Sequence, residues 1–239
     1  MSKRSGCKKL LGAAVALGLS VLATGQARAG FTSIGAPWPG EKDQAQILSN
    51  ALGGTFTASG LNYTNGTITA TRIDDSADQT FSFDIKSVDV LGVFAAQSQQ
   101  LGYTTNNGVT IHNILDASGK GFAATGSSGA IDMPASYEFV RYGDGSKFFS
   151  APTDNPDGTD HMVTYLISGK SVKNVTYVMF WEDLTAKQGG DFDYNDLSVK
   201  VVSTTPASVP LPAAAWSGMT TLLGGALVAG VRKARRQMA

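Results

Sequence analysis

Cysteine is almost absent from the chain: Cys7 is the single one in 239 residues. It lies before the apolar run of the N-terminal segment, so a chain cut behind that run keeps no cysteine. Such a chain forms no disulfide and has neither a thiolate metal site nor a cysteine nucleophile. Its core must be stabilised by burial, by hydrogen bonds and, where ligands exist, by a bound metal ion.

Charge is also scarce, at 16% of residues, whereas glycine is abundant, with 28 residues. Few charges together with many Gly, Ser, Thr and Asn residues argue against a helical bundle. This composition favours an all-β domain with many turns.

Acidic residues are missing from both ends of the chain. All 19 acids lie between Glu41 and Asp196, and nine of the 19 bases lie in residues 1–29 or from Arg232 onward. The middle therefore has 19 acids against ten bases, a net charge near −9. A body this acidic should attract cations and repel nucleic acid, so we expect no nucleic-acid partner.

The N-terminal segment has the three parts of a secretory signal peptide. A basic start to Lys9 is followed by an apolar stretch from Leu10 to Ala23 and then by Ala27-Arg28-Ala29. This pattern predicts cleavage after Ala29 by signal peptidase, so residues 1–29 are the signal peptide. The alternative is an uncleaved anchor, although the apolar stretch is short for a membrane span.

The C-terminal segment has the pattern of a membrane helix. No charge occurs between Val201 and Val231, and residues 211–231 are long enough to cross a bilayer as a helix. Trp216 suits the outer interface and the basic residues from Arg232 suit the cytoplasmic side. We expect this helix to hold the chain at the membrane, with a linker at residues 203–208.

The order of motifs in residues 209–236 resembles a PEP-CTERM sorting signal. Val209-Pro210-Leu211-Pro212-Ala213-Ala214 precedes the apolar helix and the basic cluster, and it is similar to the Val-Pro-Leu-Pro-Ala-Ala variant of that signal. The resemblance implies a Gram-negative source and processing by the membrane protease exosortase. The mature form is then at the cell surface or extracellular, and the alternative is a plain tail anchor without processing.

The body at residues 30–202 is predicted to be a β-sandwich or jelly-roll-like domain with one short helix. The helix is expected at Glu41–Leu52, where apolar residues share one face and Gly53 supplies a stop. Short β-branched and aromatic segments separated by turns predict eight strands. They are Thr67–Ile73, Thr80–Ile85, Val88–Ala95, Val109–His112, Tyr137–Tyr142, Met162–Ser168, Val175–Trp181 and Leu197–Val202.

Acidic side chains are concentrated near the end of the body. Within 15 positions lie Glu182, Asp183, Asp191, Asp193, Asn195 and Asp196. Ca²⁺ takes six to eight oxygen ligands, and a divalent ion would relieve the repulsion among these carboxylates. The first half ends a predicted strand and the second begins one, so a loop can bring the halves together. We therefore predict a Ca²⁺ site here, although the spacing is not that of an EF-hand.

A second acidic segment precedes the strand at Met162. It holds Asp154, Asp157 and Asp160, followed by His161. Two interpretations remain open: Asx turns, in which the carboxylates accept local backbone N–H groups, or metal binding.

Together these acidic segments resemble DUF4114, a β-rich module of secreted bacterial proteins. The resemblance covers residues 155–202 and rests on Asp157-Gly158-x-Asp160-His161, on Phe180-x-Glu182-Asp183-Leu184 and on Gly190-Asp191-x-Asp193-Tyr194-Asn195-Asp196. It implies a Ca²⁺ role, with Asp160 as a further candidate ligand. It implies no enzymatic activity.

The sequence contains none of the catalytic motifs that were sought. The sequence has two histidines and three glutamates, with neither a Gly-x-Ser-x-Gly elbow nor a His-Glu-x-x-His zinc motif. We therefore expect a non-enzymatic protein of the cell surface or extracellular matrix, with no catalytic residue. The alternative is a Ca²⁺-dependent, lectin-like module that binds exopolysaccharide through exposed aromatic residues. The candidates are Trp38, Tyr103, Tyr142 and Trp181.

Overall fold

The computed structural model describes residues 30–204. The predicted signal peptide at 1–29 and the predicted sorting signal at 209–236, with its helix at 211–231, lie outside these residues. Within the described part of the chain, no helix combines the length and apolar character that a membrane crossing requires.

The described residues form one α-helix, twelve strands and two short 3-10 helices. In chain order they are α1 (Gln44–Leu52), β1 (Thr57–Ser59), β2 (Asn62–Thr64), β3 (Ile68–Arg72), β4 (Ile85–Gly92), β5 (Gln99–Thr104), β6 (His112–Ala117), β7 (Ser127–Ser128), β8 (Glu138–Gly143), β9 (Ser146–Phe149), η1 (Pro152–Asp154), β10 (Met162–Gly169), β11 (Thr176–Trp181), η2 (Ala186–Gln188) and β12 (Leu197–Ser203). The prediction of an all-β domain with one helix is confirmed.

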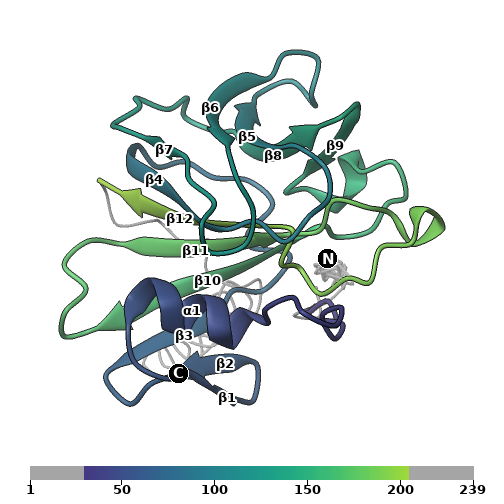
Figure 1. Ribbon diagram of the computed structural model, residues 1–239. Helices are drawn as coiled ribbons and strands as arrows, with labels where there is room; N and C mark the ends of the chain where they lie inside the picture. Colours follow the sequence, from purple (N-terminus) through teal and green to yellow (C-terminus); the bar gives the residue numbers. More distant parts are fainter. Residues whose placement is uncertain (1–29, 205–239) are drawn as a thin grey trace, which may run out of the picture.

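The strands form two antiparallel sheets. The large sheet has the order β1-β2-β3-β10-β11-β12-β4-β7 and the small sheet has the order β6-β5-β8-β9. The small sheet lies on one side of the large sheet, and α1 lies on the other (Figure 1). Strands far apart in sequence are neighbours, since β3 pairs with β10 and β4 pairs with β12.

Two apolar clusters hold these layers together. One lies between the sheets and joins Met179 and Trp181 of β11 to Leu101 and Phe139 of the small sheet. The other lies between the large sheet and α1, where Ile47 is fully buried. All six residues of β11 are buried because both faces of this strand are covered. An end of β11 is therefore a fixed position from which a site can be built.

The helix begins three residues later than predicted. Asp43 has an extended backbone and its carboxylate accepts the N–H of Gln46 at 2.7 Å. The Gln46 side chain accepts the Asp43 N–H in return, which completes a capping box. This cap leaves Glu41 outside the helix, in the segment that leads into it.

Six of the eight expected strands are observed, within a few residues, as β3, β4, β8, β10, β11 and β12. Thr80–Ile85 is wrong as a strand, because Phe81 makes only an isolated bridge to Tyr137 and Ile85 already belongs to β4. Val109–His112 is also wrong. The Asn106 carbonyl accepts the N–H of Val109 at 3.2 Å, which closes a turn and leaves Val109 84% exposed.

Candidate metal centre

The loop between β11 and β12 carries most of the predicted ligands. Trp181 pairs with Leu197 in the antiparallel ladder, so Glu182 leaves the sheet beside the point where Asp196 enters it. The N–H of Asp183 donates to Asp196 Oδ2 at 2.8 Å, which closes the base of the loop. The predicted meeting of the two halves is therefore observed.

One group of carboxylates lies at the base of this loop. Glu182, Asp183 and Asp196 each place a carboxylate oxygen within 4.8 Å of the others, and we call them the inner group. Asp183 Oδ2 accepts Gln99 Nε2 at 2.6 Å and pairs with Arg141 Nη2 at 3.2 Å. Part of the charge of the inner group is thus neutralised by a buried guanidinium.

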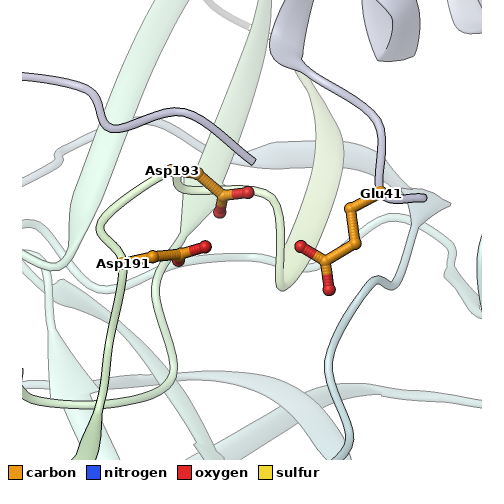
Figure 2. Close-up of side chains that lie close together, drawn as sticks. All are labelled: Glu41, Asp191 and Asp193. Atoms are coloured by element: carbon orange, nitrogen blue, oxygen red, sulfur yellow. The ribbon is translucent and has the colours of Figure 1, made fainter. Parts of the chain in front are cut away.

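A second group lies farther along the loop and includes a residue that was not predicted. Asp191 and Asp193 meet Glu41 with carboxylate oxygens within 4.8 Å, and we call these three the outer group. Their carboxylates converge from two separate segments in Figure 2. Glu41 lies in the turn before α1, where Oε2 also accepts the Trp38 N–H at 3.2 Å.

The loop backbone around the outer group is strained. Phe192 and Tyr194 have positive φ angles of 55° and 58°. Such angles are uncommon for bulky residues and cost on the order of 1–3 kcal/mol each. Tyr194 is held by a hydrogen bond from its hydroxyl to the Asp160 carbonyl at 2.8 Å, and Asn195 N donates to Asp193 Oδ1 at 3.1 Å. The surroundings therefore impose this loop conformation.

The N-terminal segment at residues 30–43 is fastened to the same loop. The N–H of Gly35 donates to the Phe192 carbonyl at 2.7 Å, and Asn195 Nδ2 donates to the Lys42 carbonyl at 3.2 Å. A Cβ on Gly35 would lie 2.1 Å from the Asp191 carbonyl oxygen, so only glycine allows this approach. These contacts hold Glu41 beside Asp191 and Asp193.

The whole inner group and two members of the outer group, Glu41 and Asp191, line one pocket of about 270 Å³. Its lining includes Trp38, Glu41, Glu182, Asp183, Asp191 and Asp196. Trp38 is 62% exposed, so an apolar ring lies at the edge of an acidic cavity.

Burial makes these carboxyl groups hold protons more tightly than usual. Burial, followed by repulsion from Asp183 and Glu182, raises the pKa of Asp196 to about 9. Burial and the charge of Asp191 raise the pKa values of Glu182 and Asp193 to about 7 each. A positive ion in the pocket would oppose each of these shifts.

Several oxygen atoms at the site have no hydrogen-bond partner among residues 30–204. They are Glu182 Oε2, Asp191 Oδ2 and Asn195 Oδ1. Within the same residues, the Arg141–Asp183 pair is the only ion pair that involves either group. The outer group therefore lacks a cationic partner, and its donor set is made of oxygen, which suits a hard cation such as Ca²⁺.

The structure does not bring every predicted ligand together. Asn195 lies beside the outer group, where Nδ2 donates to Asp193 Oδ2. Asp160 belongs to neither group, and its Oδ1 accepts the Met162 N–H at 3.0 Å. Asp157 accepts the Thr159 N–H at 3.1 Å and lies 3.2 Å from His161 Nε2, which is an Asx-turn arrangement.

The fold and the site define an all-β domain with a carboxylate-lined pocket at the end of its central strand. A domain of unknown function, DUF4114, is found at residues 125–204. This match starts 30 residues before the segment recognised from its motifs and contains β7 to β12, whereas Glu41 and α1 lie outside it. No curated protein and no solved structure matches the chain.

Proposed function

We propose that the chain is a non-enzymatic exported protein of the cell surface or extracellular matrix, stabilised by Ca²⁺ in the acidic pocket. Signal peptidase would remove residues 1–29, and exosortase would cut the tail after it has held the chain at the inner membrane. The proposal that the chain is exported and sorted rests on the sequence motifs at its two ends. We also class the two packed sheets as a β-sandwich of the jelly-roll-like kind.

The observation that carries the Ca²⁺ proposal is the outer group of Glu41, Asp191 and Asp193. Three carboxylates converge there from segments far apart in sequence, and no described ion pair neutralises them. A strained loop and a glycine contact hold them in place. Protonation or a bound divalent cation relieves this repulsion, and the cation does so while the carboxylates stay ionised.

An ion bound by the outer group would join two parts of the fold. The outer group connects the N-terminal segment to the β11–β12 loop, and the inner group lies at the base of that loop. An ion that binds only the folded state adds stability by mass action, about 2.7 kcal/mol at a concentration of 100 times its dissociation constant. The role of the ion in this proposal is structural.

The test is thermal unfolding of the full chain, kept in mild detergent, first with EDTA and then with added Ca²⁺. We expect the melting temperature to rise with Ca²⁺ and to rise less with Mg²⁺, which prefers fewer ligands and keeps its water. Asp193→Asn and Glu41→Gln should lose most of this response.

Asp132→Asn is the matched control, because Asp132 is exposed and belongs to neither carboxylate group. It should keep the full Ca²⁺ response. A melting temperature that stays constant across millimolar Ca²⁺ would leave a solvated acidic pocket and remove the proposal.

A second candidate function is Ca²⁺-dependent binding of exopolysaccharide. It is favoured by Trp38, because an exposed aromatic ring beside a metal site can stack on a sugar while the ion holds its hydroxyl groups. Trp38→Ala separates the two functions. Loss of polysaccharide binding with an unchanged Ca²⁺ response selects the lectin-like function, and absence of binding by the unaltered protein rejects it.

A further inference from the structure

Arg141 is a fully buried cation beside the inner group. It belongs to β8 of the small sheet, and its side chain is 0% exposed. Its Nη2 lies 3.2 Å from Oδ2 of Asp183, which follows the end of β11 in the large sheet. An arginine side chain stays protonated in proteins, so the inner group has a permanent positive charge next to it.

Hydrogen bonds within the small sheet fix the guanidinium in this position. Arg141 Nε donates to Gln99 Oε1 at 2.6 Å, and Nη1 donates to Ser146 Oγ at 2.7 Å. Gln99 Nε2 in turn donates to Asp183 Oδ2 at 2.6 Å. The buried side chains of Arg141, Gln99 and Asp183 therefore form a closed set of contacts, and Asp183 Oδ2 already accepts two donors.

The outer group has no equivalent of this guanidinium. Among residues 30–204, no lysine or arginine forms an ion pair with Glu41, Asp191 or Asp193. Asp191 Oδ2 is buried and accepts no hydrogen bond from the same part of the chain. The site therefore contains two groups of three carboxylates, one with a cation supplied by the chain and one without.

Apart from Arg141, the inner group has the features of an ion site. Glu182 is 1% exposed and lines the pocket, and its Oε2 has no hydrogen-bond partner among the described residues. Carboxylate oxygens within 4.8 Å of one another are close enough to share one divalent cation. A fixed positive charge beside them repels a second cation, and this repulsion is only weakly screened in a buried site.

We propose that Arg141 is a built-in counter-ion that excludes metal from the inner group and limits the pocket to one Ca²⁺, bound by the outer group. The location of that one ion rests on the proposed function, whereas the exclusion of an ion from the inner group does not. Arg141 pairs with the inner group alone. It is therefore a residue that determines where an ion binds, and it is not a ligand.

The number of ions bound per chain tests this proposal. Equilibrium dialysis of the full chain in mild detergent against radioactive Ca²⁺, after treatment with EDTA, should give one ion for the unaltered protein and none for Asp193→Asn. Arg141→Met leaves the inner carboxylates without their counter-charge, so this variant should bind two ions. Arg141→Met combined with Asp193→Asn should bind one ion, at the inner group.

Two further variants separate charge from structure. Arg141→Lys keeps a positive charge at this position and should bind one ion, as the unaltered protein does. Arg141→Met combined with Asp183→Asn removes a carboxylate together with the guanidinium and should also return to one ion. A purely structural role of Arg141 would lower the stability of its variants without adding an ion. Circular dichroism establishes that each variant is folded.

The proposal fails if folded Arg141→Met binds no more ions than the unaltered protein. It also fails if Asp193→Asn still binds an ion that Asp183→Asn removes, because the inner group then accepts metal beside Arg141. This second comparison decides the matter even if Arg141→Met does not fold. If the unaltered protein binds no ion and Arg141→Met binds one, the proposed outer site is absent while the role of Arg141 holds.

Discussion

Individual carboxyl groups in the pocket are the residues whose state depends most on conditions. Asp196 has its pKa raised to about 9, and Glu182 and Asp193 have theirs raised to about 7. Without an ion, these groups hold protons at neutral pH that the same groups in the unfolded chain have released. Under the proposed function, protons and Ca²⁺ would therefore compete for the same oxygens.

This competition predicts how stability depends on pH. A carboxyl group with a raised pKa stabilises the folded state below its unfolded pKa of about 4, and that contribution is lost as pH rises through the folded pKa. In EDTA, the melting temperature should therefore fall as pH rises toward 9. The gain from added Ca²⁺ should grow over the same range, because fewer protons compete.

Thermal melts between pH 5 and pH 9, with EDTA or with Ca²⁺, measure this dependence. Asp196→Asn removes the group with the highest pKa and should flatten the EDTA profile between about pH 7 and pH 9. A melting temperature in EDTA that increases across this range would contradict the assignment.

For single residues, the sequence predicted which acidic residues of the loop belong to the site. It did not predict which carboxylates lie together. Clustering near one loop indicated Asp191, Asp193 and Asp196, and the antiparallel pairing of β11 with β12 does bring that loop together. Glu41 could not be predicted, because the segment that carries it reaches the loop across 153 positions, as measured from Lys42 to Asn195. Such a contact is set by packing and has no local pattern.

Among the elements, the N-terminal segment has an unusual role for a stretch without regular structure. It runs against the β11–β12 loop, and Gly35 touches the loop backbone with no space for a side chain. The outer group therefore exists only while this segment is docked.

Gly35→Ala tests the docking. The added Cβ meets the Asp191 carbonyl oxygen, so the segment or the loop must shift, and overpacking of this kind costs about 1–3 kcal/mol. We expect a lower melting temperature and a weaker response to Ca²⁺. Gly129→Ala is the control, since a Cβ at Gly129 meets no atom within 4 Å. Equal behaviour of the two variants would show that the docking does not support the site.

Strand prediction succeeded where the strands are long and central. β10, β11 and β12 have dense β-branched and aromatic residues because the large sheet is covered on both faces. Six strands were not predicted: β1, β2, β5, β6, β7 and β9. In β1, β2 and β7, two or three residues carry too little pattern. In β5, β6 and β9, which belong to the small sheet, polar residues and glycine break the apolar pattern. Their extended form depends on the neighbouring strand.

At the scale of the whole molecule, the DUF4114 match and the folded body differ in extent. The match covers residues 125–204, yet β10 and β12 in that segment pair with β3 and β4 outside it. A fragment limited to the match would expose two strand edges and lose the α1 side of the core. The folded body is therefore residues 30–204 as a unit.

The two ends provide a prediction about the whole chain in its host. If the motifs act as proposed, N-terminal sequencing of the exported protein begins at Gly30. The intact mass from a host with exosortase should lack the apolar helix and the basic cluster that contains Arg236. In a host without exosortase, the mass should include Arg236. A mature form that keeps Arg236 in both hosts indicates a plain tail anchor.

The pairing of β3 with β10 and of β4 with β12 has a consequence for the time course of folding. Contacts between distant segments require closure of long loops before they contribute any stability, and domains rich in them fold in milliseconds to seconds. Neither face of the large sheet can be completed before β12, which ends at Ser203, is available. If the chain is exported as proposed, its N-terminal half would cross a narrow channel unfolded, and the body would fold as one cooperative unit on the far side.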